Sequence, residues 1–190
     1  IAVCGYHGWQ DWYLAANLEN EKNLDKHLMK NLPIKGVPNN YKDNIKTFQY
    51  NDFLKLNKII NQNSLAAVIM EVSRDEKPKN DFLKKVRQLT EKKKIPLIFD
   101  ECTSGFRETF GGLHYKYGVN PDIVIYGKAL GNGYAINAVV GKEEIMKESL
   151  KTFISSTFWT ERIGSAAAIE TLNQMEKLQS WKIITKIGKM

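Results

Sequence analysis

Cysteine is scarce in this sequence. Cys4 and Cys102 are the only two cysteines, and neither has a sequence neighbour that could pair with it. A disulfide framework or a zinc site needs several closely spaced ligands. The sequence therefore predicts neither a disulfide nor a metal site, and reducing, cytoplasmic conditions are the default expectation.

Long apolar runs are also missing. No segment approaches the roughly 20 apolar residues that span a bilayer, and none has the order of a signal peptide. The hydrophobic fraction of 43% and charged fraction of 26% are typical of a globular protein with no membrane partner. The chain begins with Ile1, inside an apolar segment, so we expect residues 1–190 to be part of a longer protein.

Arginine is rare although the net charge is +7. Lysines carry most of the positive charge and are scattered along the chain. Phosphate and base recognition favours the guanidinium fork of arginine. We therefore expect a solvated basic surface and no nucleic-acid partner.

The apolar pattern predicts alternating strands and helices, with no internal repeat. Expected strands cover 1–4, 65–70, 96–100, 122–126 and 135–141. Expected helices cover 10–19, 51–62, 80–94, 142–150 and 163–179, and 20–47 is expected to be irregular. Continuous apolar strands that alternate with amphipathic helices indicate an α/β fold with a largely parallel sheet.

Polar residues follow several of the expected strands, at Glu71, at Asp100 and Glu101, and at Lys128. Ligands bind at the carboxyl ends of strands in such sheets. A strand-end carboxylate can hold a metal or a protonated nitrogen, or simply cap the next turn. An Asp-Glu strand end also occurs in nucleotide hydrolases, but those need a GxxxxGK[ST] loop, and this sequence has none.

Lys128 lies in YGKALGNG, directly after an apolar strand. This position favours burial or a cleft, where a desolvated lysine becomes a nucleophilic amine. The glycines allow the backbone to approach a ligand closely. A pyridoxal-phosphate (PLP) site requires a lysine that forms a Schiff base and an Asp that keeps the pyridine nitrogen protonated. Lys128 and Asp100 meet both requirements.

Two further segments have both a binding and a packing interpretation. The aromatic residues of YHGW (6–9) could stack on a planar ligand or pack onto the core. The hydroxyls of 155–157 could bind phosphate or cap a helix.

Taken together, these segments resemble the class III PLP-dependent aminotransferases of fold type I, and most closely members similar to glutamate-1-semialdehyde aminomutase. The matching segments are YHGW (6–9), AAVIMEV (66–72), LIFDECTSGFR (97–107), PDIVIYGKALGNGYAINAVVG (121–141) and STFWTERIG (156–164). Their order matches the family, and they are spread over about four fifths of the chain.

The resemblance implies roles for particular residues. Lys128 would form the Schiff base and then shuttle a proton, and Asp100 would pair with the pyridine nitrogen. Tyr6 and His7 would lie beside the cofactor ring, one of them stacked on it. The remaining cofactor-binding candidates are Glu71 after its strand, Cys102 on the opposite ring face, Thr103 near the ring hydroxyl, and Thr157, which would reach the phosphate of the neighbouring subunit in a homodimer.

The sequence departs from the family pattern at four places. Val72 follows Glu71 where members commonly have Pro, and Asp75-Glu76 replaces a Gly-Asn pair. Cys102-Thr103 and Glu161-Arg162 also differ from the common residues.

The resemblance implies that 1–190 is a partial large, PLP-binding domain without the upstream phosphate-loop segment and the downstream small domain. Uncovered apolar surface is then expected. The implied activity is amino-group transfer from an amino donor to a carbonyl acceptor, as a transaminase or a 2,1-aminomutase, with a decarboxylase as a further member type. Two alternatives remain: a non-catalytic relic of this fold that serves as a binding or dimerisation partner, and a nucleotide-binding domain.

Overall fold

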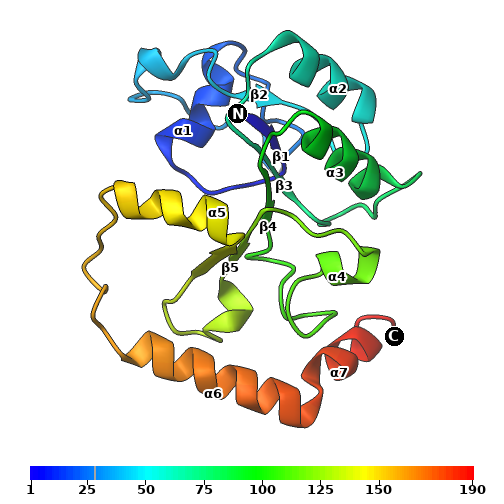
Figure 1. Ribbon diagram of the computed structural model, residues 1–190, viewed down its shortest axis with the longest axis vertical. Coiled ribbons are helices and arrows are strands. Elements are labelled where there is room, and N and C mark those ends of the chain that lie inside the picture. The colour runs from blue at the N-terminus through cyan, green and yellow to red at the C-terminus, as the bar shows by residue number, and fades with distance from the viewer. Residues whose placement is uncertain (28) are drawn as a thin grey trace. The chain divides into compact units, whose positions relative to one another are not determined.

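A computed structural model describes residues 1–27 and 29–190. The chain forms two compact units, Ile1–Ile98 and Phe99–Met190. In Figure 1 the first unit runs from blue to green and the second from green to red. Strand β4, Leu97–Asp100, begins in the first unit and ends in the second.

The first unit is built on a parallel strand arrangement in the order β2-β1-β3. These strands are β1 (Ala2–Cys4), β2 (Lys46–Thr47) and β3 (Val68–Glu71). β1 and β3 are buried along their whole length, as expected for strands that are covered on both faces. The short β2 lies in the segment 20–47, which the sequence analysis expected to be irregular throughout.

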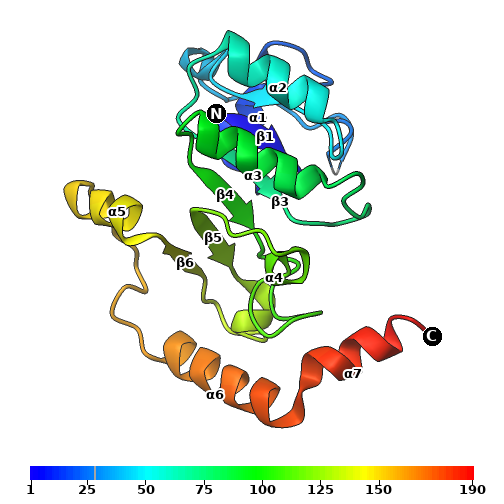
Figure 2. The ribbon, with the colours of Figure 1, turned by 45° about the vertical axis from the view of Figure 1, so that its right-hand side comes forward.

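Two amphipathic helices, α2 (Phe53–Gln62) and α3 (Phe82–Lys92), lie side by side in the first unit (Figures 1 and 2). The Asp52 side chain accepts a 2.9 Å hydrogen bond from the Lys55 N–H and so caps α2. Spacing of three and four residues brings the apolar side chains of each helix onto one face. These buried side chains are Leu56, Ile59 and Ile60 in α2 and Phe82, Leu83 and Val86 in α3.

The rest of the first unit is less regular. The expected helix at 10–19 is a short α1 (Asp11–Leu14) followed by a 3-10 turn, Ala15–Leu18. A second 3-10 turn covers Asn39–Tyr41.

The second unit has the strand order β4-β5-β6, with β5 at Ile123–Tyr126 and β6 at Ala138–Gly141. β6 runs antiparallel to β5, so that Ile123 lies opposite Gly141. The connection from 127 to 137 contains only a single 3-10 turn, and a parallel return would need a longer crossover. The fold is thus α/β with a mostly parallel sheet, as predicted, and β6 is its antiparallel exception.

The prediction of a buried strand over 135–141 is wrong in extent and in burial. Only Ala138–Gly141 is a strand, and Val139 and Val140 are more than half exposed. A continuous apolar run indicates two covered faces only when other elements pack on both, and the described residues do not cover this strand in that way.

The second unit has a small apolar core of Phe106, Val124, Tyr126, Leu130 and Ala168. Helix α6 (Ile163–Leu178) supplies Ala168 and packs Leu172 and Met175 against this core. The apolar pattern predicted a helix at α6 (Ile163–Leu178), but not the short α4 (His114–Tyr117) or the separate α7 (Ser180–Ile187) that follows α6 (Figure 2). The helices are α4 (His114–Tyr117), α5 (Glu143–Met146), α6 (Ile163–Leu178) and α7 (Ser180–Ile187), with 3-10 turns at Lys128–Leu130 and Lys147–Lys151.

Much apolar surface in the second unit is exposed, as the sequence analysis expected. Phe153 is 97% and Leu150 85% exposed, and α7 presents Ile183, Ile184 and Ile187 to solvent. Isolated exposed apolar residues are ordinary, but a concentration of them indicates a surface that another structure covers. Within the described ranges, no helix is both long enough and apolar enough to cross a membrane.

Candidate functional site

The loop after β1 places Tyr6 and His7 in different surroundings. The His7 ring is buried, with its Nε2 3.0 Å from the Cys4 carbonyl oxygen, and it stacks on Trp12. Tyr6 is only half-buried, and its ring makes an edge contact with Trp9 at a centroid distance of 5.1 Å. The packing interpretation therefore fits His7, and Tyr6 is the better candidate for stacking on a ligand.

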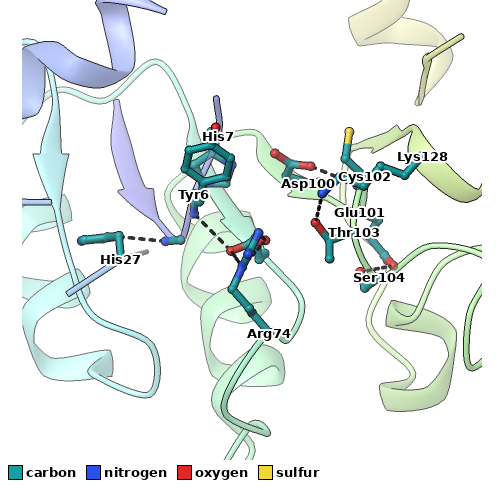
Figure 3. A network of polar contacts seen from close by, with 12 residues as sticks. Tyr6, His7, His27, Arg74, Asp100, Glu101, Cys102, Thr103, Ser104 and Lys128 are labelled. Atoms are coloured by element: carbon teal, nitrogen blue, oxygen red, sulfur yellow. Dashed lines mark hydrogen bonds and ion pairs between the residues drawn. The ribbon is translucent and has the colours of Figure 1, made fainter. Parts of the chain in front are cut away.

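Glu71, at the end of β3, is held inside the first unit by Arg74. The Arg74 Nε lies 2.9 Å and 3.0 Å from the two carboxylate oxygens, and Nη2 lies 2.6 Å from Oε1. The Tyr6 N–H donates to Oε2 of the same carboxylate at 3.1 Å. Glu71 thus fixes the backbone of the aromatic loop at Tyr6. Figure 3 labels Tyr6 and Arg74, the two residues that bond this carboxylate.

Sequence reasoning did not single out Arg74. Its guanidinium lies 5.8 Å from the centre of the Tyr6 ring, a cation–π distance. Burial raises the pKa of Tyr6, and the Arg74 charge opposes that rise. An arginine three residues after a strand-end glutamate was the available signal, but that spacing is common on surfaces.

In the second unit, the consecutive carboxylates Asp100 and Glu101 have different roles. An oxygen of Asp100 accepts a 3.1 Å hydrogen bond from the Cys102 N–H, which forms a local side-chain turn. Asp100 is half-buried, whereas Glu101 is fully buried. One oxygen of Asp100 therefore caps the following turn, as the capping interpretation predicted. This contact is compatible with a ligand at the end of the strand.

Glu101 is the buried hub of the loop that follows β4. Its carboxylate accepts hydrogen bonds from the Ser104 hydroxyl at 2.9 Å and from the N–H groups of Leu113 at 2.5 Å and His114 at 3.1 Å. The His114 ring nitrogen Nδ1 lies 2.6 Å from the same carboxylate. These contacts make Glu101 a structural residue, which weakens the nucleotide-hydrolase interpretation of the Asp-Glu pair.

Gly127 separates Lys128 from the end of β5, and the Lys128 Nζ donates a 2.8 Å hydrogen bond to Oγ1 of Thr103 (Figure 3). The backbone of Lys128 has a φ of 41°, in the left-handed region that residues with a side chain seldom adopt. Backbone strain of this kind is concentrated at functional sites. Lys128 is exposed and not buried, whereas the alternative expectation of a cleft position agrees with the cavity that this residue lines.

Gly127 allows close packing just before Lys128. A Cβ atom at Gly127 would collide with Oδ1 of Asn137 and would lie 3.2 Å from Sγ of Cys102. Cys102 and Asn137 therefore pack against the backbone that carries Lys128. Sequence reasoning missed Asn137, because it lies in an apolar run that indicated only a strand.

A cavity of about 590 Å³ opens beside Lys128 in the second unit. It is lined by Lys128, Tyr134, Ala135, Ile136, Asn137, Ser156, Phe158 and Trp159. Thr157 is exposed and is not among the lining residues. Its proposed role toward a neighbouring subunit stays a prediction.

Glu161, one of the departures from the family pattern, has a local role at the start of α6. It accepts hydrogen bonds from the N–H groups of Ile163 and Gly164. These N–H groups lower the pKa of the Glu161 carboxyl, as is usual for an acid at a helix N-terminus.

Burial and the Glu101 carboxylate together raise the pKa of Tyr126, at the end of β5.

The described residues contain no group of three or more His, Cys, Asp or Glu side chains that could hold a metal ion. The polar groups that line the cavity are the Lys128 amine, the Asn137 amide and the hydroxyls of Tyr134 and Ser156.

Comparison with known proteins identifies the family. Residues 2–190 match the family model described as aminotransferase class-III. The chain is 35% identical over 198 residues to a 3-aminobutyryl-CoA aminotransferase of Cloacimonas acidaminovorans, an alignment that covers 100% of the chain and 44% of that protein. It is 40% identical over 147 residues to a glutamate-1-semialdehyde 2,1-aminomutase of Nitrosopumilus maritimus, covering 73% of the chain and 34% of that protein.

A solved structure gives the same result. An omega-transaminase from Sphaerobacter thermophilus is 25% identical and has a TM-score of 0.77, with 92% of the chain and 43% of that protein covered. The chain spans less than half the length of each of these relatives. From the match over residues 2–190 and from these relatives, the chain belongs to the class-III aminotransferase family.

Proposed function

We propose that the complete protein is a PLP-dependent enzyme that transfers an amino group from an amino donor to a carbonyl acceptor, as a transaminase or a 2,1-aminomutase. The observation that carries this proposal is the Lys128 amine, which lies beside a cavity and 2.8 Å from the Thr103 hydroxyl. Family membership and relatives named as aminotransferases and aminomutases support it.

The residues present fit the cofactor. When bound, PLP supplies a protonated ring that accepts electrons from the substrate carbon. Asp100 offers a carboxylate for the ring nitrogen, and Gly127 leaves room for Cys102 and Asn137 next to the lysine backbone. Lys128 would bond the cofactor and then take and return the proton at the substrate carbon that bears the nitrogen.

The other proposed contacts rest on the family resemblance. The full set of proposed cofactor-binding residues is Tyr6, His7, Glu71, Asp100, Cys102, Thr103, Lys128 and Thr157. The buried positions of His7 and Glu71 suit indirect roles, since both hold the loop that carries Tyr6.

Cofactor trapping on the complete gene product tests this function. We expect borohydride reduction in the presence of PLP to leave a phosphopyridoxyl group on Lys128, which mass spectrometry would locate. Lys128→Ala should lose the label and lower activity by roughly a thousandfold, in line with the loss of a positioned acid-base group. Lys142→Ala is the matched control, because Lys142 is a lysine of the same unit that pairs with Asp122.

Label spread over surface lysines, with Lys128 unmodified, would contradict the proposal. A non-catalytic relic of the fold would then be the better interpretation.

We further propose a homodimer with shared active sites in the cytoplasm. The exposed Thr157 and the exposed apolar surface around it support a second subunit, and the two free cysteines support a reducing compartment. Mixing Lys128→Ala chains with Thr157→Ala chains should restore part of the activity if sites are shared. No recovery in mixed dimers that are shown to form would refute a shared site.

A further inference from the structure

Lys128 is fixed at its backbone end. The Leu130 N–H donates to the Gly127 carbonyl at 3.0 Å, and the Asn132 N–H donates to the Lys128 carbonyl at 2.9 Å. The left-handed φ of 41° persists only where such surroundings enforce it. The origin of the side chain is therefore set by the turn after β5.

Without a second point of attachment, the amine end of the Lys128 side chain would sample many rotamers. Lysine carries its amine on four flexible methylene groups, and ordering them costs conformational entropy. Thr103 provides that second point, because its Oγ1 accepts the Nζ–H of Lys128 at 2.8 Å. The lysine is thus held at both ends although it is exposed.

Thr103 is itself well supported. Its carbonyl accepts a 2.7 Å hydrogen bond from Nε of Arg107, and the preceding Cys102 N–H is held by Asp100 at 3.1 Å. The Gly105 N–H donates to the carbonyl of Glu101 at 2.8 Å, and Glu101 is the fully buried hub of this loop. The hydroxyl therefore projects from a rigid turn and not from a mobile loop.

We propose that Thr103 is a positioning residue for Lys128. It holds the amine at the strand end whenever the amine is not bonded to the cofactor, and so keeps it in place for bond formation and for proton transfer. This inference rests on the proposed function and deepens it. It gives Thr103 a role toward the lysine that differs from the ring-hydroxyl contact implied by the family resemblance.

The test compares Thr103→Val, which removes the hydroxyl at nearly constant volume, with Thr103→Ser, which keeps it. The readout is the rate at which the complete apo-protein forms a borohydride-trappable bond between PLP and Lys128, followed by mass spectrometry. One hydrogen bond corresponds to roughly a three- to tenfold change in this rate. We expect that slowing in Thr103→Val and a rate within about twofold of the parent in Thr103→Ser.

Thr109→Val is the matched control. Thr109 lies in the same loop, and its hydroxyl donates to the Gly112 carbonyl at 2.9 Å, away from Lys128. Its rate should equal that of the parent. An unchanged rate in Thr103→Val, or an equal loss in Thr103→Ser or Thr109→Val, would overturn the inference.

The parent protein separates this inference from the proposed function. If the parent forms no PLP bond at Lys128, both the proposed function and this inference fail. If the parent forms the bond and Thr103→Val forms it equally fast, only the role of Thr103 fails.

Discussion

The two units treat the polar residues at their strand ends differently. In the first unit, Glu71 is 5% exposed and is neutralised by Arg74. In the second unit, the buried Glu101 hub supports a loop whose Thr103 hydroxyl meets an exposed Lys128. The first unit thus pairs its strand-end carboxylate with an arginine, whereas in the second unit a buried carboxylate orders the loop whose Thr103 hydroxyl holds the exposed Lys128 amine.

The largest expected loss of stability comes from removing the charged partner of Glu71 in the first unit. Arg74→Met leaves the Glu71 carboxylate buried without its charged partner, which costs about 4 kcal/mol of unfolding free energy. Urea unfolding at neutral pH measures it. The double variant Arg74→Met, Glu71→Gln should recover part of the loss, and a double variant no more stable than the single one would show that the ion pair is not the cause.

A variant of Glu101 tests how much the buried carboxylate stabilises the second unit. Glu101→Gln keeps the shape but replaces one accepting oxygen with a donating amide, which faces the N–H group of either Leu113 or His114, because these two groups bond different carboxylate oxygens. We expect a loss of about 3 kcal/mol in unfolding free energy. Glu91→Gln is the control, because Glu91 is 60% exposed in its pair with Arg87, and it should cost below about 0.5 kcal/mol.

A smaller effect is the pH dependence of stability that arises from His27 in the first unit. Burial lowers the pKa of His27 from 6.5 to about 4, and the nearby His7 adds to the shift. Its Nδ1 accepts the Gly5 N–H at 2.9 Å, so that the ring is held neutral. Because the unfolded chain binds the proton more readily, stability falls as pH drops below 6.5 and continues to fall until about pH 4.

Between pH 7 and pH 5 this histidine should cost the protein about 2 kcal/mol of unfolding free energy. Urea unfolding at the two pH values gives the difference, and His27→Gln should remove most of it. An undiminished pH dependence in His27→Gln would assign the effect to other groups.

The smallest expected effect separates packing from backbone strain in the first unit. Gly5 and Gly36 both have a positive φ, 99° and 97°, and an alanine would be strained at either. A Cβ at Gly5 would lie 2.5 Å from Oε2 of Glu71, whereas at Gly36 nothing lies within 4 Å. Gly5→Ala should therefore be less stable than Gly36→Ala by about 1 kcal/mol. Equal melting temperatures would mean that Glu71 moves aside freely.

Sequence reasoning predicted the regular elements that bury an apolar face. The strands at 1–4, 96–100 and 122–126 and the helices at 51–62, 80–94 and 163–179 all appear, within a few residues. It did not predict α4 or α7. Both are short or almost wholly exposed, and such helices depend on contacts that apolar periodicity does not encode.

Candidate site residues divide in the same way. Asp100 and Lys128 became candidates because their residue types stand at the ends of apolar strands, and their roles toward a cofactor stay predictions. Arg74 was missed because its spacing of three residues from Glu71 is common on surfaces, and Asn137 was missed because it lies within an apolar run. The choice between two carboxylates also needed the structure, which shows Glu101 at the centre of a hydrogen-bonded loop.

The sequence by itself determined the α/β alternation, the family and the positions of Asp100 and Lys128 after their strands, because periodicity and motif order are properties of the chain alone. Only the tertiary structure decided that Arg74 neutralises Glu71, that β6 turns back antiparallel, and that Lys128 is exposed and held by Thr103. The Lys128–Thr103 contact joins residues 25 positions apart. The Glu71–Arg74 pair and the β5–β6 pairing are closer in the chain, but they depend on how the loops between the partners fold. Such contacts are fixed only when packing and hydrogen bonding are satisfied together.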